Sequence, residues 1–193
     1  MPSSQETTVQ DSGFADPTPP REPDDAGHRT MRRATAGDAA TVRAVTRAAY
    51  AKWVPLLGRE PLPMTVDYDV ALRDHRVDLL LIDGDVAALI EMAPAPDHLL
   101  VVNVAVAPAH QHRGHGRALL AHAEEVAWSL GLGEIRLYTN ALFAENLRLY
   151  RQLGYRVQRE EAHPRLGVAI HMGKRFGSAE AATCTESSNG GQP

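Results

Sequence analysis

The sequence contains a single cysteine, Cys184, among 193 residues. One cysteine supports neither a disulfide framework within the chain nor a cysteine-rich metal site. Basic residues are fewer than acidic ones, 20 against 24, and the net charge of −4 argues against a general nucleic-acid binder. Long apolar runs are missing too: none approaches the roughly 20 residues that cross a membrane, and no signal peptide is visible. We therefore expect a cytoplasmic protein with no nucleic-acid or membrane partner.

Large apolar side chains are nearly absent from the two ends of the chain. Residues 1–28 and 177–193 are rich in small, polar and charged residues, a composition typical of disordered segments. The whole chain is 44% hydrophobic and long enough for one domain with an ample core. We predict one folded domain at 29–176 between two disordered tails. The tails are most simply dispensable, and a regulatory role for either stays open.

The stretch 101–120 combines three patterns. An apolar run at 99–106 predicts a strand, the polar turn Gln111–Gly116 contains two glycines, and an amphipathic helix follows. Free N–H groups at the start of a helix, together with the positive end of its dipole, bind anions and above all phosphate. Glycine lets the backbone approach such a ligand, because a Cβ would block it. The expected buried face of the helix is Leu119, Leu120, Ala123, Val126 and Ala127.

Two common phosphate-binding turns do not match this stretch. A P-loop ends in Gly-Lys and then serine or threonine, but Gly116 is followed by Arg117 and Ala118. A dinucleotide-binding turn needs a third glycine, where this chain has Leu119. The remaining pattern, Gln-x-x-Gly-x-Gly after Val-Ala-Val-x-Pro, resembles the GNAT superfamily of acetyl-CoA-dependent N-acetyltransferases. In that family the turn cradles the pyrophosphate of CoA, so the resemblance implies acetyl-CoA as cosubstrate.

A second match covers 137–155, LYTNALFAENLRLYRQLGY. It resembles the GNAT pattern of a strand, a helix that carries asparagine and tyrosine, and then Leu-Gly-Tyr. Asn146 and Tyr150 are four residues apart and so share one helical face. The resemblance implies that Tyr150 lies near the CoA sulfur as the general acid. Many members carry the asparagine seven residues before the tyrosine, where this chain has Phe143.

The resemblance implies an α/β GNAT fold. Its sheet is mixed and mostly antiparallel, has six or seven strands with helices on both faces, and is splayed between two parallel central strands, where CoA enters. From the sequence we expect strands at 30–34, 77–83, 86–92, 98–106, 134–139, 155–159 and 168–172, helices at 35–50, 67–74, 114–130 and 143–153, and a loop at 52–65.

The resemblance also implies a set of cofactor-binding residues. A bulge in the central strand would turn backbone N–H groups toward the reacting carbonyl oxygen. The complete set is Val104, Ala105 and Val106 in that strand, Gln111, His112, Arg113, Gly114, His115, Gly116 and Arg117 in the turn, and Asn146. Arg117 could instead lie on the solvated face of its helix. His110, His112, His115 and His122 suggest a metal site, but no carboxylate is spaced to complete one, so we expect no metal.

The general base is not obvious from the sequence. A lysine-like amine with a pKa of about 10.4 must lose a proton before it attacks a thioester. Histone-acetylating members carry a glutamate on the central strand, where this chain has Leu100. Glu91, in the apolar segment ALIEM, is the best substitute, because a carboxylate there is unexpected unless it faces a wet cleft. Two alternatives stay open. Glu91 could simply lie at the exposed end of its strand, or water could remove the proton of the amine with no dedicated residue.

The predicted loop at 52–65 contains more apolar residues than an exposed loop usually does. In the GNAT family, this loop and the helices beside it form one wall of the substrate groove. Candidates for that wall, or equally for core packing, are Tyr50, Trp53, Leu57, Met64 and Tyr68. The predicted function is transfer of an acetyl group from acetyl-CoA to a primary amine of a small molecule or peptide. The rival is a non-catalytic CoA-binding or sensor module of the same fold. Homodimer formation stays open.

Overall fold

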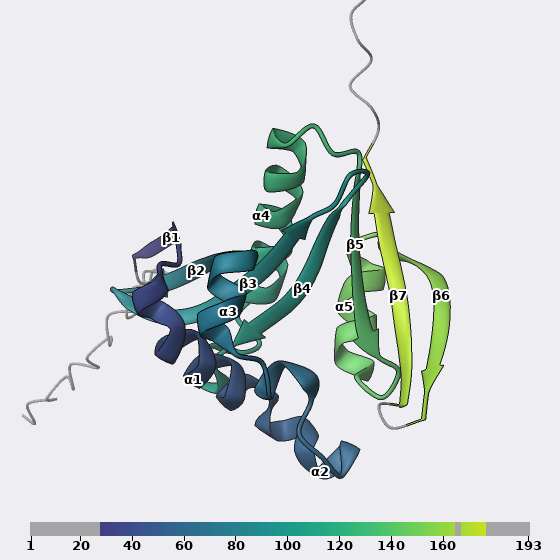
Figure 1. The fold of residues 1–193 in the computed structure, drawn as a ribbon, viewed down its shortest axis with the longest axis horizontal. Coiled ribbons are helices and arrows are strands. Elements are labelled where there is room, and N and C mark those ends of the chain that lie inside the picture. Colours follow the sequence, from purple (N-terminus) through teal and green to yellow (C-terminus); the bar gives the residue numbers. More distant parts are fainter. Residues whose placement is uncertain (1–27, 165–166, 177–193) are drawn as a thin grey trace, which may run out of the picture.

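A computed structural model describes residues 28–164 and 167–176. Its seven strands form one sheet in the order β1-β2-β3-β4-β5-β7-β6 (Figure 1). The strands are β1 (Arg29–Arg33), β2 (Arg76–Ile82), β3 (Asp85–Pro94), β4 (Leu99–Val106), β5 (Glu134–Asn140), β6 (Arg156–His163) and β7 (Gly167–Arg175). Apart from His28, the two tails predicted to be disordered lie outside the described residues.

Helices cover both faces of this sheet. Those of the α type are α1 (Ala39–Tyr50), α2 (Val54–Leu57), α3 (Tyr68–Asp74), α4 (His115–Ser129) and α5 (Ala144–Gln152); the 3₁₀ turns are η1 (Ala36–Asp38), η2 (Ala51–Trp53), η3 (Leu62–Met64) and η4 (Pro108–His110). Side chains of α1 and α3 form one core cluster, and those of α4 and α5 form the other. Within the described residues, no helix combines the length and apolar character needed to cross a membrane.

The sheet opens between its only parallel neighbours, β4 and β5. These strands pair over three residues only, Leu99–Val101 with Ile135–Leu137, and then diverge toward the end where α2 lies (Figure 1). The other neighbouring strands are antiparallel. The predicted mixed, mostly antiparallel sheet with a splay between two parallel central strands is therefore confirmed.

A bulge lies in β4 where the split begins. Val102 has no partner on β3, because the residues on either side of it pair with the consecutive residues Glu91 and Met92. Side chains of a strand alternate between the two faces of the sheet. One extra residue therefore moves the side chain of each later residue to the opposite face from the one it would otherwise occupy. Val101 accordingly packs in the cluster with α4 and α5, while Ala105 packs in the cluster with α1 and α3.

The two amphipathic helices bury the faces that their spacing predicts. In α1, Val42 and Thr46 are fully buried, and in α4 all five predicted apolar residues are buried. Gly114 precedes α4 with a φ of +81°, and Gly131 follows it with a φ of +71°. These left-handed conformations cost glycine little, so the two glycines set the ends of the helix.

The predicted loop at 52–65 is wrong in part, since it contains α2 and two 3₁₀ turns. Its prolines do not break these turns. Pro55 occupies the first turn of α2, where the missing N–H would have no partner in any case. Gly58 then ends α2 in the left-handed conformation, with a φ of +66°. The β2–β3 hairpin also turns one residue earlier than predicted, at Asp83-Gly84, with φ of 52° and 91°.

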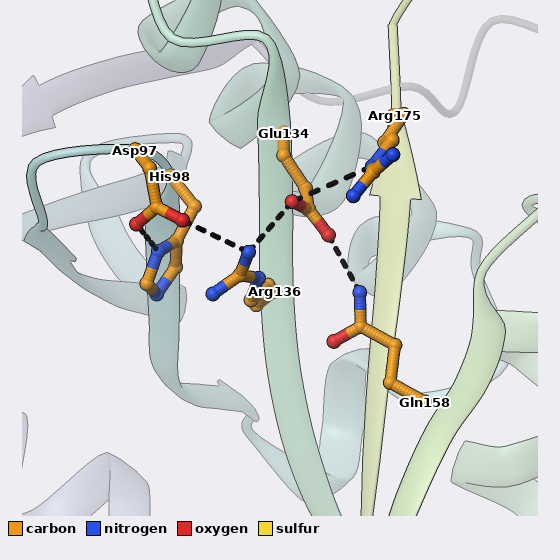
Figure 2. A network of polar contacts seen from close by, with 6 residues as sticks. All are labelled: Asp97, His98, Glu134, Arg136, Gln158 and Arg175. Atoms are coloured by element: carbon orange, nitrogen blue, oxygen red, sulfur yellow. Dashed lines mark hydrogen bonds and ion pairs between the residues drawn. The ribbon is translucent and has the colours of Figure 1, made fainter.

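A polar network fixes the closed end of the split, where β4 and β5 are hydrogen-bonded (Figure 2). Arg136 on β5 contacts Asp97, just before β4, at 3.0 Å, and Glu134 at 2.8 Å. Gln158 on β6 donates to Glu134 at 2.5 Å, and Arg175 on β7 lies 3.7 Å from the same carboxylate. Arg136, and then Gln158, lower the pKa of Glu134. The network therefore ties four strands together at the end opposite the opening.

Candidate active site

The Gln111–Gly116 turn lines a cavity of about 440 Å³, which we call the turn cavity. His112 has a φ of +61° and Gly114 a φ of +81°, so the backbone bends sharply before α4 begins at His115. The first N–H groups of a helix have no partner within the helix. Of the predicted cofactor-binding residues, those that line the turn cavity are Val104, Val106, Gln111, His112, Gly114, His115, Gly116, Arg117 and Asn146.

Two predicted cofactor residues do not line the turn cavity. Ala105 is buried in the cluster with α1 and α3, on the other face of the sheet, and the Arg113 side chain is exposed. His115 is buried at the helix start, and burial lowers the pKa of its imidazole. His122 lies apart from the turn and contacts Asp78 through Nε2 at 2.7 Å. His110, His112 and His115 therefore line the turn cavity together, and His122 is the one of the four that lies apart.

The backbone of β4 presents N–H groups to the split. Ala107 donates its N–H to Ala87 at the end of the β3 pairing, at 2.9 Å. The N–H and C=O groups of successive residues in a strand point to opposite sides. Since the N–H of Ala107 points toward β3, the N–H groups of Val104 and Val106 point away from β3 and toward the gap between β4 and β5. Gln111 supports this direction, because its Nε2 donates to the carbonyl oxygen of Val106 at 3.0 Å.

A second cavity of about 270 Å³, the sheet cavity, lies beside β4, β5 and β7. Its lining includes Leu57 and Leu62 from the α2–η3 segment, Tyr138 and Asn140 on β5, Glu161 and His163 on β6, and Ala169 and His171 on β7. Four residues line both cavities: Tyr50, Val104, Asn146 and Tyr150. The two cavities therefore meet at the split in the sheet.

Tyr150 lies at this junction. Its side chain is buried, and in the described parts of the chain its hydroxyl has no hydrogen-bond partner. Burial raises the pKa of Tyr150 to about 12, so the hydroxyl stays protonated at neutral pH and is available as a donor. Asn146, one helical turn earlier, lines both cavities beside it.

The predicted groove wall divides between the cavities and the core. Tyr50 lines both cavities, Leu57 lines the sheet cavity, and Trp53 lines the turn cavity and stacks on Phe143 with 4.4 Å between ring centroids. Met64 and Tyr68 are buried and line neither cavity. These last two belong to the core rather than to the wall.

Glu91 is not brought to either cavity. Only 2% of its surface is exposed, and its Oε1 lies 2.6 Å from Nδ1 of His75. Burial, and then the charge of Glu91, raise the pKa of Tyr138 on β5. Glu91 thus affects Tyr138, which lines the sheet cavity, although Glu91 itself lines neither cavity.

Sequence reasoning missed two polar residues on the strands of the site, Asn103 and His171. Both interrupt apolar segments, VVNVAV and VAIHM, and this is the signal that singled out Glu91. Asn103 is buried and binds Tyr50 at 2.9 Å. His171 lines the sheet cavity, with Nε2 at 3.1 Å from Glu161.

Comparison with known proteins identifies the family. The sequence profile described as "Acetyltransferase (GNAT) family" matches residues 43–155, more than half of the chain. The protein belongs to the GNAT acetyltransferase family. It is therefore an acetyltransferase.

This GNAT acetyltransferase has a relative among curated proteins and several among solved structures. Streptothricin acetyltransferase of Streptomyces lavendulae is 32% identical over 75 residues, which are 38% of this chain and 40% of that protein. The match thus spans less than half of that relative's length.

The solved structures share the fold. The PaiA N-acetyltransferase of Thermoplasma acidophilum, in complex with coenzyme A, has a TM-score of 0.67 at 18% identity, over 77% of this chain and 99% of that one. The ribosomal-protein-S18-alanine N-acetyltransferase of Escherichia coli has a TM-score of 0.67 at 21% identity, over 80% and 98%. Nourseothricin acetyltransferase has a TM-score of 0.59 at 21% identity, over 76% and 98%.

Proposed function

We propose that this protein transfers the acetyl group of acetyl-CoA to a primary amine of a small molecule. The observation that carries the proposal is the junction of the two cavities at Tyr150 and Val104. One cavity is bounded by a phosphate-binding type of turn, and the other is open to a second substrate. A group transfer needs the two reactants held in contact, which such a junction provides.

The turn cavity is the proposed cofactor site. The N–H groups at the start of α4 would hold the pyrophosphate of CoA, and Arg117, which lines the same cavity, adds positive charge. The pantetheine arm would then follow the split toward Tyr150. At its end, the N–H groups of Val104 and Val106 would stabilise the negative charge that develops on the acetyl oxygen.

Tyr150 is proposed to stabilise the leaving sulfur. Its pKa of about 12 lies well above the value of about 8.5 for a thiol, so full proton transfer to a free thiolate would be unfavourable by about 5 kcal/mol. A hydrogen bond from the hydroxyl to the sulfur carries no such cost. The hydrogen bond from Tyr150 therefore strengthens only as negative charge develops on the sulfur during C–S bond breaking. Such a bond raises the rate without strengthening ground-state binding.

The sheet cavity favours a small, positively charged acceptor. Its volume of about 270 Å³ is near the lower end of ligand-binding pockets. Tyr50 and Tyr138 offer aromatic surfaces to a cation, and Glu161 offers a carboxylate. The similarity to streptothricin and nourseothricin acetyltransferases points in the same direction. Streptothricin is accordingly the first acceptor to test.

An acceptor comparison tests the proposal. The purified chain is incubated with acetyl-CoA and, separately, streptothricin, cadaverine and a peptide that begins with alanine. Release of CoA and the mass of each product are measured. We expect acetylation of streptothricin and little or none of the peptide. A preference for the peptide would overturn the small-molecule assignment, and no transfer to any amine would overturn the proposed function.

A further inference from the structure

The proposed reaction still needs a group that removes a proton from the acceptor. Glu91 is buried outside both cavities, so it cannot touch an amine in the sheet cavity. Imidazole is the side chain suited to this task near neutral pH, and the described lining of the sheet cavity contains two, His163 and His171. We infer that His171 is the general base of the acetyl transfer and that Glu161 positions its ring. This inference rests on the proposed function.

His171 is placed next to the opening of the sheet. The pairing of β4 with β5 ends at Leu137, so Tyr138 is the first residue of β5 beyond it. His171 on β7 is the residue opposite Tyr138, and the two rings lie 5.8 Å apart. Neighbouring strands are about 4.8 Å apart, which brings the imidazole within reach of an amine at the split, directly or through one water. His163, in contrast, ends β6 at the far hairpin, opposite Gly167.

The contact with Glu161 fixes the protonation pattern of the ring. Nε2 of His171 lies 3.1 Å from Oε2 of Glu161. An ionised carboxylate only accepts hydrogen bonds, so this close contact favours the neutral tautomer with its proton on Nε2 and its lone pair on Nδ1. Nδ1 has no partner among residues 28–164 and 167–176. The free lone pair belongs to a ring that lines the sheet cavity, as a base for the acceptor requires.

Charged groups surround the ring. Glu161 faces it from β6, and Arg159, also on β6, lies 3.0 Å from Glu161. Tyr138 faces it from β5, and Arg59 lines the same cavity from the segment before η3. The arrangement resembles a histidine held by a carboxylate in acyl-transfer enzymes, where the carboxylate orients the ring and stabilises its charge.

The acceptor ammonium loses two protons in the proposed reaction, and each has a destination. The acceptor ammonium loses one proton to Nδ1 of His171, and its nitrogen lone pair forms the C–N bond. The C–S bond breaks, and the second proton passes from the nitrogen to the leaving sulfur through water, while the hydroxyl of Tyr150 donates a hydrogen bond to that sulfur. His171 then returns its proton to water. The sum is one acetamide, one CoA thiol and one released proton for each ammonium and acetyl-CoA consumed.

The pH dependence of kcat/KM for streptothricin tests the base. At pH 7 an amine of pKa about 10.4 is neutral in roughly one molecule in 10³. An enzyme without its base can use only this neutral fraction of the acceptor. We expect His171→Gln to lower kcat/KM about 100-fold at pH 7. The loss should shrink to a few-fold near pH 10, where the amine needs no base. His28→Gln, the same exchange at an exposed residue that lines neither cavity, should match the wild type throughout.

A second readout does not depend on turnover. The ring nitrogen signals of His171, measured by NMR in the free protein, should indicate a single Nε2–H tautomer in the wild type and a mixture of both tautomers in Glu161→Gln, because the carboxylate that orients the ring is gone. Acetyl-CoA affinity, measured by calorimetry, should be unchanged in both variants. A Glu161→Gln variant in which His171 keeps the single tautomer of the wild type would overturn the positioning role.

The outcomes separate this inference from the proposed function. An active wild type with an unaffected His171→Gln variant, or with a loss that is equal at every pH, overturns the base and leaves the function standing. A wild type that acetylates no amine overturns both.

Discussion

The hydroxyl of Tyr50 donates a hydrogen bond to Oδ1 of Asn103, with 2.9 Å between the two oxygen atoms. Tyr50 ends α1 and lines both cavities, while Asn103 follows the bulge in β4. The amide nitrogen of Asn103 also contacts the hydroxyls of Tyr68 at 3.2 Å and Thr46 at 3.4 Å. One buried asparagine thus fixes the wall of the site to the strand that borders the split.

Removal of this amide should cost stability. Asn103→Ala removes a hydrogen-bond partner from the hydroxyls of Tyr50, Tyr68 and Thr46, of which Tyr68 keeps its bond to the carbonyl oxygen of Pro63. We expect the free energy of unfolding to fall by about 2–4 kcal/mol. Urea denaturation measures the change. Asn146→Ala is the matched control, because the Asn146 amide is partly exposed and has no hydrogen bond in the described residues; it should cost less than about 1 kcal/mol. Equal costs would contradict the role given to Asn103.

The Gly114 position should be sensitive to a side chain because of the cofactor. A Cβ there meets no protein atom within 4 Å, since the space beside it opens to the turn cavity. Gly114→Val should weaken acetyl-CoA binding at least tenfold, about 1.4 kcal/mol, by calorimetry. Gly84→Val controls for backbone strain, because Gly84 has a similar φ of +91° with open space around it, in the β2–β3 turn. Unchanged affinity in a folded Gly114→Val variant would reject the cofactor site.

Gly173 has a different reason to lack a side chain. A Cβ on it would lie 2.2 Å from Nε2 of Gln158, the group that donates to Glu134. Gly173→Ala should displace Gln158, break part of the network at the closed end of the split and cost about 1–3 kcal/mol in thermal or urea unfolding. The cost should be smaller in a Gln158→Ala background. Gly133→Ala, with no atom near its Cβ, is the control and should be close to neutral.

Alkaline pH should unfold the protein through its buried tyrosines. Burial raises the pKa of Tyr150 and of Tyr68 to about 12, from the ordinary value of 10.0. A folded-state pKa above the unfolded value contributes stability that is complete below pH 10 and lost as pH rises toward 12. Ultraviolet absorbance of tyrosinate and circular dichroism, followed together, should change in the same pH range. Ionisation of both tyrosines at pH 10 in a folded protein would contradict their burial.

Sequence patterns predicted the parts of this structure that local chemistry dictates. The turn at Gly114 follows from a backbone that must adopt a positive φ, and the α4 core face follows from helical periodicity. Tyr150 was placed by its spacing within a helix and by the family resemblance. Each of these features depends on residues within one or two helical turns.

The features that sequence missed depend on pairing between distant segments. A bulge in the central strand was expected from the family resemblance, but Val102 looks like any residue of an apolar strand, so only the register with β3 gives the position of the bulge. His171 and Glu161 meet because β6 and β7 pair in one particular register. Glu91 is a carboxylate in an apolar strand, and this predicted that it would face a solvent-filled cleft. In the structure its carboxylate instead contacts the imidazole of His75. The predicted loop at 52–65 contains α2, because the first turn of a helix accepts a proline such as Pro55.

We propose that acetyl transfer takes place where the two cavities meet, with the Tyr150 hydroxyl at the leaving sulfur. The most direct test is kcat of Tyr150→Phe with streptothricin, measured beside the acetyl-CoA affinity of the same folded variant. The substitution removes a hydroxyl that has no partner within the described residues, so affinity should stay within about twofold of the wild type. We predict that kcat falls roughly 10- to 1,000-fold, the effect of one lost transition-state donor. A kcat within twofold of wild type, with chemistry shown to limit the rate, would contradict the claim.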